Sequence, residues 1–280
     1  MGSSKRGGGP VVVMAFQGWN DAADAATSVL DFLADTYPTE MVVSTDSEDF
    51  FDYQLTRPST IVNEKGEREL VWPCVSVELC HLPKREIMLV SGPEPNLHWR
   101  EFAVWLESVT TAFRPSLIVL LGAMLSDSPH TRPFEVSGLA PHNLAGALQL
   151  EPNDYEGPTG IIGVMTQLYQ TQCPDKLVTM WVSVPHYTAP APNPKAGLAL
   201  LERLQTTLGT PFDLTQWRDS VVAWESQINE LVEEDPDMSE YVQALEQQTD
   251  SETVPQGTGD KLAEAFEEYL SHRRRPEAGA

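Results

Sequence analysis

A wholly apolar run from Val11 to Phe16, rich in β-branched residues, opens the ordered part of the sequence. Such a run is typical of a strand that is buried on both faces of a sheet. It ends at Gly18, and the residues from Ala22 to Leu33 follow a helical pattern with Asn20 or Asp21 as the N-cap. Because a strand, a turn and a helix in this order begin a β-α-β unit, the chain is expected to build a sheet that helices cover.

The same alternation continues along the chain. Further strands are predicted at Met41–Ser44, Val75–Leu79, Glu86–Val90, Leu117–Leu121, which Gly122 should end, and Leu177–Val184. Helices are predicted around residues 102–109, 141–148, 160–172 and 194–208, and a hairpin at 61–71. Apolar strands separated by helices imply right-handed crossovers and a mostly parallel or mixed sheet. The predicted fold class is α/β, a three-layer α/β/α sandwich with an α-helical C-terminal appendage.

Acidic residues are concentrated in one part of the chain. The 280 residues include 41 Asp and Glu but only 18 Lys and Arg, which gives a net charge of −23. Residues 213–252 alone hold 12 acidic residues and one basic residue, and their net charge of −11 equals that of the preceding 212 residues. This shift predicts a disordered tail at 1–9, an α/β domain at 10–210, an acidic helical appendage at 211–250, and a linker with a terminal helix at 251–280.

The charge also bears on partners. A strongly negative chain repels phosphate backbones and anionic lipid heads, so neither nucleic acid nor a membrane is an expected partner. No window approaches the roughly 18 consecutive apolar residues that span a bilayer, and the N-terminus lacks the apolar core of a secretory signal. Three cysteines without a Cys-x-x-Cys pair argue against a disulfide scaffold, so a cytoplasmic location is expected.

Three amphipathic helices are predicted beyond Pro211, at residues 214–234, 238–248 and 261–273. The first carries apolar residues at spacings of three and four, namely Trp217, Val221, Trp224, Ile228 and Leu231. Such a stripe must pack on something. Packing on the chain's own domain and contact with another subunit are both open at this point.

Candidate binding residues come from the loops after predicted strands, because ligands of open α/β sheets bind at the carboxyl ends of strands. The loop after the first strand offers Asn20 and Asp21, which are also expected to cap the next helix, with Trp19 as an anchor. The loop before the helix at 160–172 offers Tyr155, Gly157 and Thr159. This helix has no carboxylate in its first turn, so its N-terminus suits an anion better than that of the first helix, and Thr159 is expected to satisfy its first donors.

Two further loops carry histidines. Asp127, His130 and Arg132 follow the strand at 117–121, and with Ser126 they invite comparison with a nucleophile, base and orienter. The Gly-x-Ser-x-Gly elbow is missing, so turn capping or contact with a partner group is the competing interpretation. His186 and Tyr187 follow the last strand and could orient a ligand or transfer a proton, although a packed structural histidine is the more common case.

Sequence motifs for cofactors are missing. There is no His-Glu-x-x-His, no paired Cys-His spacing and no Asp-x-Asp-x-Asp-Gly loop, and neither common glycine-rich nucleotide motif occurs. We therefore expect no metal and no cofactor, and assign no catalytic residue.

Four phrases, in this order, resemble the proteasome assembly chaperone family in its long bacterial branch with a helical C-terminus. They are Ala15–Ala26 (AFQGWNDAADAA), Leu120–Met124 (LLGAM), Tyr155–Gly160 (YEGPTG) and Trp181–Tyr187 (WVSVPHY), and the match spans roughly residues 10–250. The resemblance implies a purine-nucleoside-phosphorylase-like α/β/α fold, self-association and binding of other proteins. It implies no settled enzymatic activity. Archaeal-type relatives dock on proteasome rings through a hydrophobic–Tyr–any tail, whereas this sequence ends Glu277-Ala278-Gly279-Ala280, so docking of that kind is not expected.

Two functions are compatible with these observations. The first is a non-enzymatic, cytoplasmic homo-oligomer that binds protein partners as an assembly chaperone does. The alternative is a small-molecule binder, or a hydrolase- or phosphorylase-like enzyme for a nucleoside or an ester, built from strand-end loops. The alternative requires Asp21, His130, Arg132, Tyr155 and His186 to surround one crevice.

Overall fold

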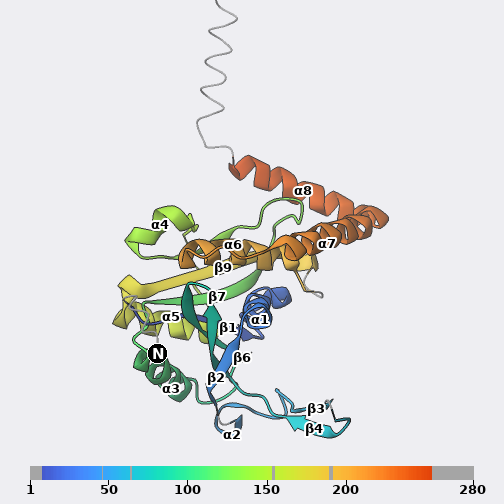
Figure 1. Ribbon diagram of the computed structural model, residues 1–280. Helices are drawn as coiled ribbons and strands as arrows, with labels where there is room; N and C mark the ends of the chain where they lie inside the picture. Colours follow the sequence, from blue (N-terminus) through green and yellow to red (C-terminus); the bar gives the residue numbers. More distant parts are fainter. Residues whose placement is uncertain (1–7, 46, 64, 153–154, 189–191, 254–280) are drawn as a thin grey trace, which may run out of the picture. The chain divides into compact units, whose positions relative to one another are not determined.

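A computed structural model describes residues 8–45, 47–63, 65–152, 155–188 and 192–253. Its centre is a seven-stranded sheet in the order β2-β5-β6-β1-β7-β9-β8 (Figure 1). The strands are β1 (Val11–Gln17), β2 (Thr39–Ser44), β5 (Ser76–Leu82), β6 (Arg85–Pro93), β7 (Leu117–Ser126), β8 (Val136–Leu139) and β9 (Leu177–Pro185). The four central strands β6, β1, β7 and β9 are parallel, and antiparallel strands flank them on both sides. The prediction of a mixed α/β sheet is confirmed.

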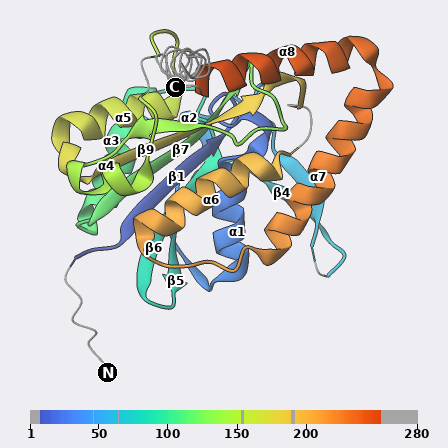
Figure 2. The same ribbon diagram turned by 90° about the horizontal axis from the view of Figure 1, so that it is seen from above.

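Helices cover both faces of the sheet. The helices are α1 (Thr27–Thr36), α2 (Ser47–Phe50), α3 (Trp99–Ala112), α4 (His142–Leu148), α5 (Ile161–Gln172), α6 (Pro194–Leu208) and α7 (Thr215–Glu234), with 3₁₀ turns η1 (Ala22–Asp24), η2 (Pro174–Lys176) and η3 (His186–Thr188). Figure 1 shows α6 on one side of β7 and β9 and α3 and α5 on the other, and Figure 2 shows α6 lying across α1. The three-layer arrangement is confirmed.

The side chains of β1 contribute to two hydrophobic cores, one on each face of the sheet. Val11, Val13 and Ala15 point to the face covered by α1, α4, α6 and α7, whereas Val12, Met14 and Phe16 point to the face covered by α2, α3 and α5. Alternate side chains of a strand point to opposite faces, and here all six are buried. Polar positions on either face would interrupt one of these cores.

Gly122 does not end the strand at 117–121, and this prediction is wrong. β7 continues to Ser126 and pairs with β9 as far as Pro185. A Cβ at Gly122 would lie 2.5 Å from the ring of Trp181 on β9, so the missing side chain makes room for an indole instead of a turn. The strand β8 was not predicted at all. Its Gly138 has a φ of +153° and approaches the backbone of Thr179 too closely for any side chain.

The hairpin predicted at 61–71 is present as β3 (Ser59–Val62) and β4 (Arg68–Val71), which form a separate two-stranded sheet. All eight strand residues are exposed. In Figure 1 the hairpin extends away from the seven-stranded sheet. It is the part of the fold with the least burial.

The chain divides into two compact units, and the boundary falls inside α7, between Asn229 and Glu230. Within the first unit, Trp224 is buried and Trp217 and Ile228 are partly buried against the core on the α6 face. The apolar stripe therefore packs on its own domain. As a result the first unit extends past residue 210, the boundary expected from the sequence. Leu231, at the end of the stripe, is exposed.

The second unit contains the last turn of α7 and α8 (Pro236–Thr253), and α8 covers the predicted helix at 238–248. The tail at residues 1–7, most of the predicted linker and the terminal helix at 261–273 lie outside the described residues. No helix in the described ranges is long and apolar enough to cross a membrane.

Candidate functional site

The carboxylate of Asp21 caps the first helix, although Asp21 lies six residues before Thr27, the first residue of α1, whereas a standard N-cap lies one residue before. One of its carboxylate oxygens accepts from the backbone N–H of Ala26 at 2.6 Å, and the carboxylate also accepts from the backbone and hydroxyl of Thr27. Burial raises the pKa of Asp21, and the hydrogen bonds from Thr27 and Ala26 oppose this rise. The η1 turn separates Asp21 from α1, so the predicted helix from Ala22 starts only at Thr27.

Asn20 is fully buried beside the start of α5. Its Nδ2 donates to Oε1 of Glu94 at 2.6 Å, and the same oxygen accepts the backbone N–H of Ile161 at 2.6 Å. The N-terminus of α5 is therefore occupied by a carboxylate of the chain itself, which follows β6. The sequence predicted that Thr159 would satisfy the first donors, but Gly160 is the N-cap and Glu94 accepts from the first N–H.

A hollow of about 220 Å³ lies in front of this helix end. Its wall consists of Trp19, Glu94, Trp99, Pro158, Thr159 and Gly160. Trp19, which the sequence suggested as an anchor, is 61% exposed. Thr159 and Glu94 thus belong to the same wall, together with Trp19 from the loop after β1.

Tyr155 and Gly157 belong to the same loop and precede Pro158, the first residue of this loop in the wall of the hollow. The hydroxyl of Tyr155 donates to the carbonyl of Pro158 at 3.0 Å. A Cβ at Gly157 would lie 2.5 Å from the Tyr155 hydroxyl oxygen. Glycine therefore allows the phenol to close the loop over its own backbone.

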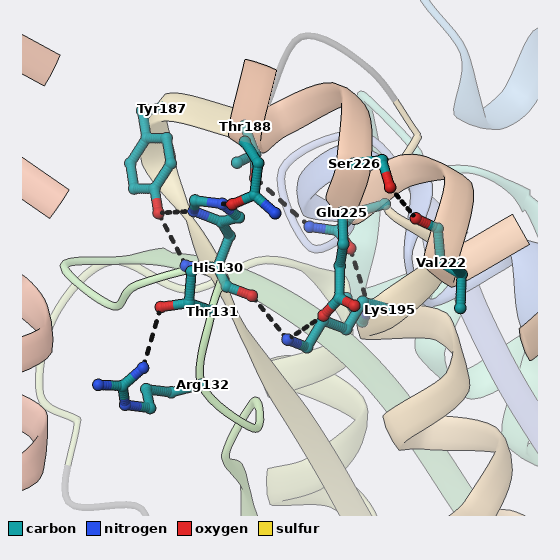
Figure 3. A network of polar contacts seen from close by, with 12 residues as sticks. His130, Thr131, Arg132, Tyr187, Thr188, Lys195, Val222, Glu225 and Ser226 are labelled. Carbon is teal, nitrogen blue, oxygen red and sulfur yellow. Dashed lines mark hydrogen bonds and ion pairs between the residues drawn. The ribbon is translucent and has the colours of Figure 1, made fainter. Parts of the chain in front are cut away.

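His130 is at the centre of a second cluster (Figure 3). Its Nδ1 lies 2.7 Å from the hydroxyl of Tyr187, which also accepts the backbone N–H of His130 at 2.7 Å. Its Nε2 lies 2.9 Å from Oδ1 of Asn229 on α7. A neutral imidazole with its proton on Nε2 satisfies all three contacts, because the phenol then donates to Nδ1 and Nε2–H donates to the amide oxygen.

Lys195 joins this cluster from the first turn of α6. Its Nζ donates to the carbonyl of His130 and to Oε1 of Glu225, both at 2.6 Å, and lies 5.1 Å from the ring centre of Phe134 (Figure 3). Only 14% of the Lys195 side chain is exposed. Arg132, also in this loop, donates to the hydroxyl of Thr131 at 3.3 Å.

Asp127 and His186 form an exposed pair. Nδ1 of His186 lies 3.3 Å from Oδ1 of Asp127, and 47% and 79% of the two side chains are exposed. Ser126 lies 2.8 Å from the hydroxyl of Ser128. A nucleophile, base and orienter set would require His130 to lie between Ser126 and Asp127. Instead, Nδ1 of His130 contacts Tyr187 and Nε2 contacts Asn229.

The predicted residues are thus distributed over three sets of contacts. Thr159 lines the hollow and Asn20 donates to Glu94 in its wall, His130 and Tyr187 form the buried cluster, and Asp127 pairs with His186. Sequence reasoning missed Glu94, Trp99, Lys195 and Asn229. Glu94 follows a strand, so the strand-end argument could have found it. Within the described ranges, no group of three or more His, Cys, Asp or Glu side chains could hold a metal ion.

The PAC2 family model matches residues 15–232. The chain belongs to the PAC2 family. The match contains all ten predicted binding residues and the hollow, and it ends three residues beyond the first compact unit. The family suggested by the four phrases is confirmed.

Solved structures of PAC2 relatives agree with this placement. A proteasome-assembly chaperone homologue from Mycobacterium tuberculosis is 40% identical, with a TM-score of 0.74 over 83% of this chain and 99% of the other. A PAC2 family protein from Streptomyces avermitilis is 36% identical, with the same TM-score and the same coverage. A protein of unknown function from Corynebacterium glutamicum is 26% identical, with a TM-score of 0.81 over 90% and 94%. No curated protein matches the chain.

Proposed function

We propose that this PAC2 protein is a non-enzymatic, cytoplasmic, self-associating protein that binds other proteins in the manner of an assembly chaperone. Family membership supports this function, and so does the name of the Mycobacterium tuberculosis relative. The three cysteines are free, as suits a reducing compartment. Asp21 and His130, two of the five residues that the enzymatic alternative requires around one crevice, are buried and hydrogen-bonded within the chain.

The exposed hairpin is the observation that carries the proposal. Val62 is 67% exposed and Leu70 54%, and Ile61, Val71 and the adjoining Trp72 are also exposed. An isolated two-stranded hairpin is marginal in water and needs a further strand or a packed face. Val62 and Leu70 share one face of the hairpin, and exposed apolar side chains on a common face are typical of a surface that binds protein.

Charge favours a second copy of the chain as one occupant of this surface. Residues 55–72 contain three acidic and three basic residues, so this segment is neutral in a chain of net charge −23. Two copies repel one another over most of their surfaces, and the repulsion is weakest at a neutral segment. The edge strand β2, with Met41 and Val42 exposed, offers unpaired backbone groups as well.

Light scattering after size exclusion tests self-association. The full chain is expected to have the mass of two or more copies, and the double variant Val62→Glu, Leu70→Glu is expected to have the mass of one. Val104→Glu is the matched control, because Val104 is 64% exposed on α3, outside the hairpin. A single-copy mass for the unmodified chain, or an unchanged oligomer in the double variant, would contradict the proposal.

A further inference from the structure

The hollow in front of α5 combines two indoles with one carboxylate. Trp19 lies on the loop after β1, Trp99 begins α3, and Glu94 follows β6. The indole of Trp99 is held in place because its Nε1–H donates to the carbonyl of Pro95. Indole faces attract cations through their ring quadrupole, and a carboxylate attracts them by charge.

One carboxylate oxygen of Glu94, Oε1, fixes the side chain in place. Oε1 accepts from Asn20 Nδ2 and from the backbone N–H of Ile161, which uses both of its lone pairs. Among the described residues no hydrogen bond reaches Oε2. The second carboxylate oxygen is thus available at a preset position.

The buried neighbours of Glu94 keep this position rigid. Asn20 has no exposed surface, and a Cβ at Gly160 would lie 2.2 Å from its Oδ1 and 2.5 Å from Oε1 of Glu94. Only glycine at this helix start lets the amide and the carboxylate lie against the backbone. The carboxylate therefore needs little reorganisation when a cation arrives.

The size of the hollow limits the ligand. At about 220 Å³ it is smaller than the roughly 300–1,000 Å³ of pockets for drug-sized molecules. The end of one long side chain fits within it. A single carboxylate oxygen between aromatic walls suits a compact cation.

We propose that this hollow binds the ammonium group of a lysine side chain on a partner protein. The partner class rests on the proposed function, and the cation chemistry rests on Trp19, Trp99 and Glu94. Lysine fits better than arginine, because a guanidinium binds a carboxylate best through two oxygens and Oε1 is already occupied. A partner with an exposed lysine would also be attracted by the net charge of −23.

The test is a titration of the ¹⁵N-labelled full chain, read from the indole N–H signals of Trp19 and Trp99. Replacing each tryptophan by phenylalanine assigns its signal. The probes are N-acetyl-lysine methylamide, its norleucine counterpart, which keeps the stem but lacks the ammonium, its arginine counterpart, and the free diamine putrescine. Blocked lysine is expected to shift both signals in a saturable manner, and norleucine is expected to leave them unchanged.

Glu94→Gln tests the carboxylate with little change in shape, since a glutamine Oε1 still accepts from Asn20 and Ile161. It is expected to weaken lysine binding at least fivefold. Glu101→Gln, the control, removes an exposed charge in the first turn of α3 and is expected to leave the affinity unchanged. Trp19→Ala is a second variant that does not disturb the core, because Trp19 is exposed, and it too is expected to weaken binding.

The inference would be overturned by equal shifts with norleucine, by no saturable shift with lysine, by unchanged affinity in Glu94→Gln, or by arginine binding as tightly as lysine. Putrescine binding tenfold tighter than blocked lysine would assign the hollow to a free amine and overturn the protein side chain as its occupant. Self-association is measured on the hairpin variants, in which Glu94 is unchanged. The two proposals can therefore fail separately.

Discussion

The phenol oxygen of Tyr187 lies 2.7 Å from both the backbone nitrogen and Nδ1 of His130. One hydroxyl thus accepts a hydrogen bond from the loop after β7 and donates one to the ring of the same residue. With Asn229 on Nε2, the imidazole joins that loop, the η3 turn and α7. His130 holds three parts of the first unit together, and its ring nitrogens are already used.

Replacing Tyr187 by phenylalanine is expected to destabilise the fold. The change leaves an N–H and a ring nitrogen of the buried His130 without this partner, which costs about 1–3 kcal/mol of unfolding free energy. Urea unfolding measures the loss. Tyr155→Phe, which removes an exposed hydroxyl bonded to Pro158, is the control and is expected to cost less. Equal losses in the two variants would contradict the role assigned to Tyr187.

Lys195→Met is expected to cost more than the equivalent change at Arg218. Lys195 donates to the His130 carbonyl and pairs with Glu225, and its side chain is only 14% exposed. Losing these contacts should cost about 1–3 kcal/mol. Arg218 pairs with Glu202 at 3.2 Å with 58% and 41% of the side chains exposed, so Arg218→Met should cost under about 1 kcal/mol. Denaturant unfolding compares the two, and a larger loss at Arg218 would show that the buried pair is not the stronger one.

Gly160→Ala is expected to disturb the start of α5. The new methyl group would lie within 2.5 Å of both Asn20 and Glu94, and overpacking of this kind costs about 1–3 kcal/mol. Gly146, inside α4, has no atom within 4 Å of its Cβ position, so Gly146→Ala should stabilise by about 0.4–1 kcal/mol. Thermal unfolding of both variants tests the contrast. A stabilised Gly160→Ala protein would mean that the hollow is looser than described.

Asp21 predicts a pH dependence that Asp21→Asn should remove. Burial raises the pKa of Asp21 above its ordinary value of 3.8, so the folded chain holds this proton more tightly than the unfolded chain. The resulting stabilisation is present at low pH and is lost as the pH rises from about 4 through the raised pKa. The unfolding free energy of the unmodified chain should therefore fall relative to that of Asp21→Asn over this range and then run parallel. Parallel curves throughout the acidic range would contradict a raised pKa.

The apolar runs predicted the central strands because both faces of those strands are buried, as in β1, β7 and β9. Periodicity could not predict that Gly122 lies under Trp181, since that contact joins two strands far apart in the sequence. It could not find β8 either, because four residues with an internal glycine carry little pattern.

The candidate site was predicted less completely than the fold. The strand-end rule selected His130, Tyr187 and Asn20, but the partners that determine their roles come from elsewhere in the chain. Asn229 is 99 residues from His130, and Glu94 is 74 residues from Asn20. Contacts over such separations depend on the packing of whole elements, which local sequence does not encode.

The central claim is that the exposed β3–β4 hairpin is covered when copies of the chain associate. Amide hydrogen exchange across the hairpin tests this claim most directly. The full chain is labelled at a low and a high protein concentration, with the Val62→Glu, Leu70→Glu variant beside it. Residues 59–71 are expected to exchange more slowly at the high concentration in the unmodified chain, with no such slowing in the variant. Equally fast exchange of the hairpin at both concentrations in the unmodified chain would show that association does not cover it.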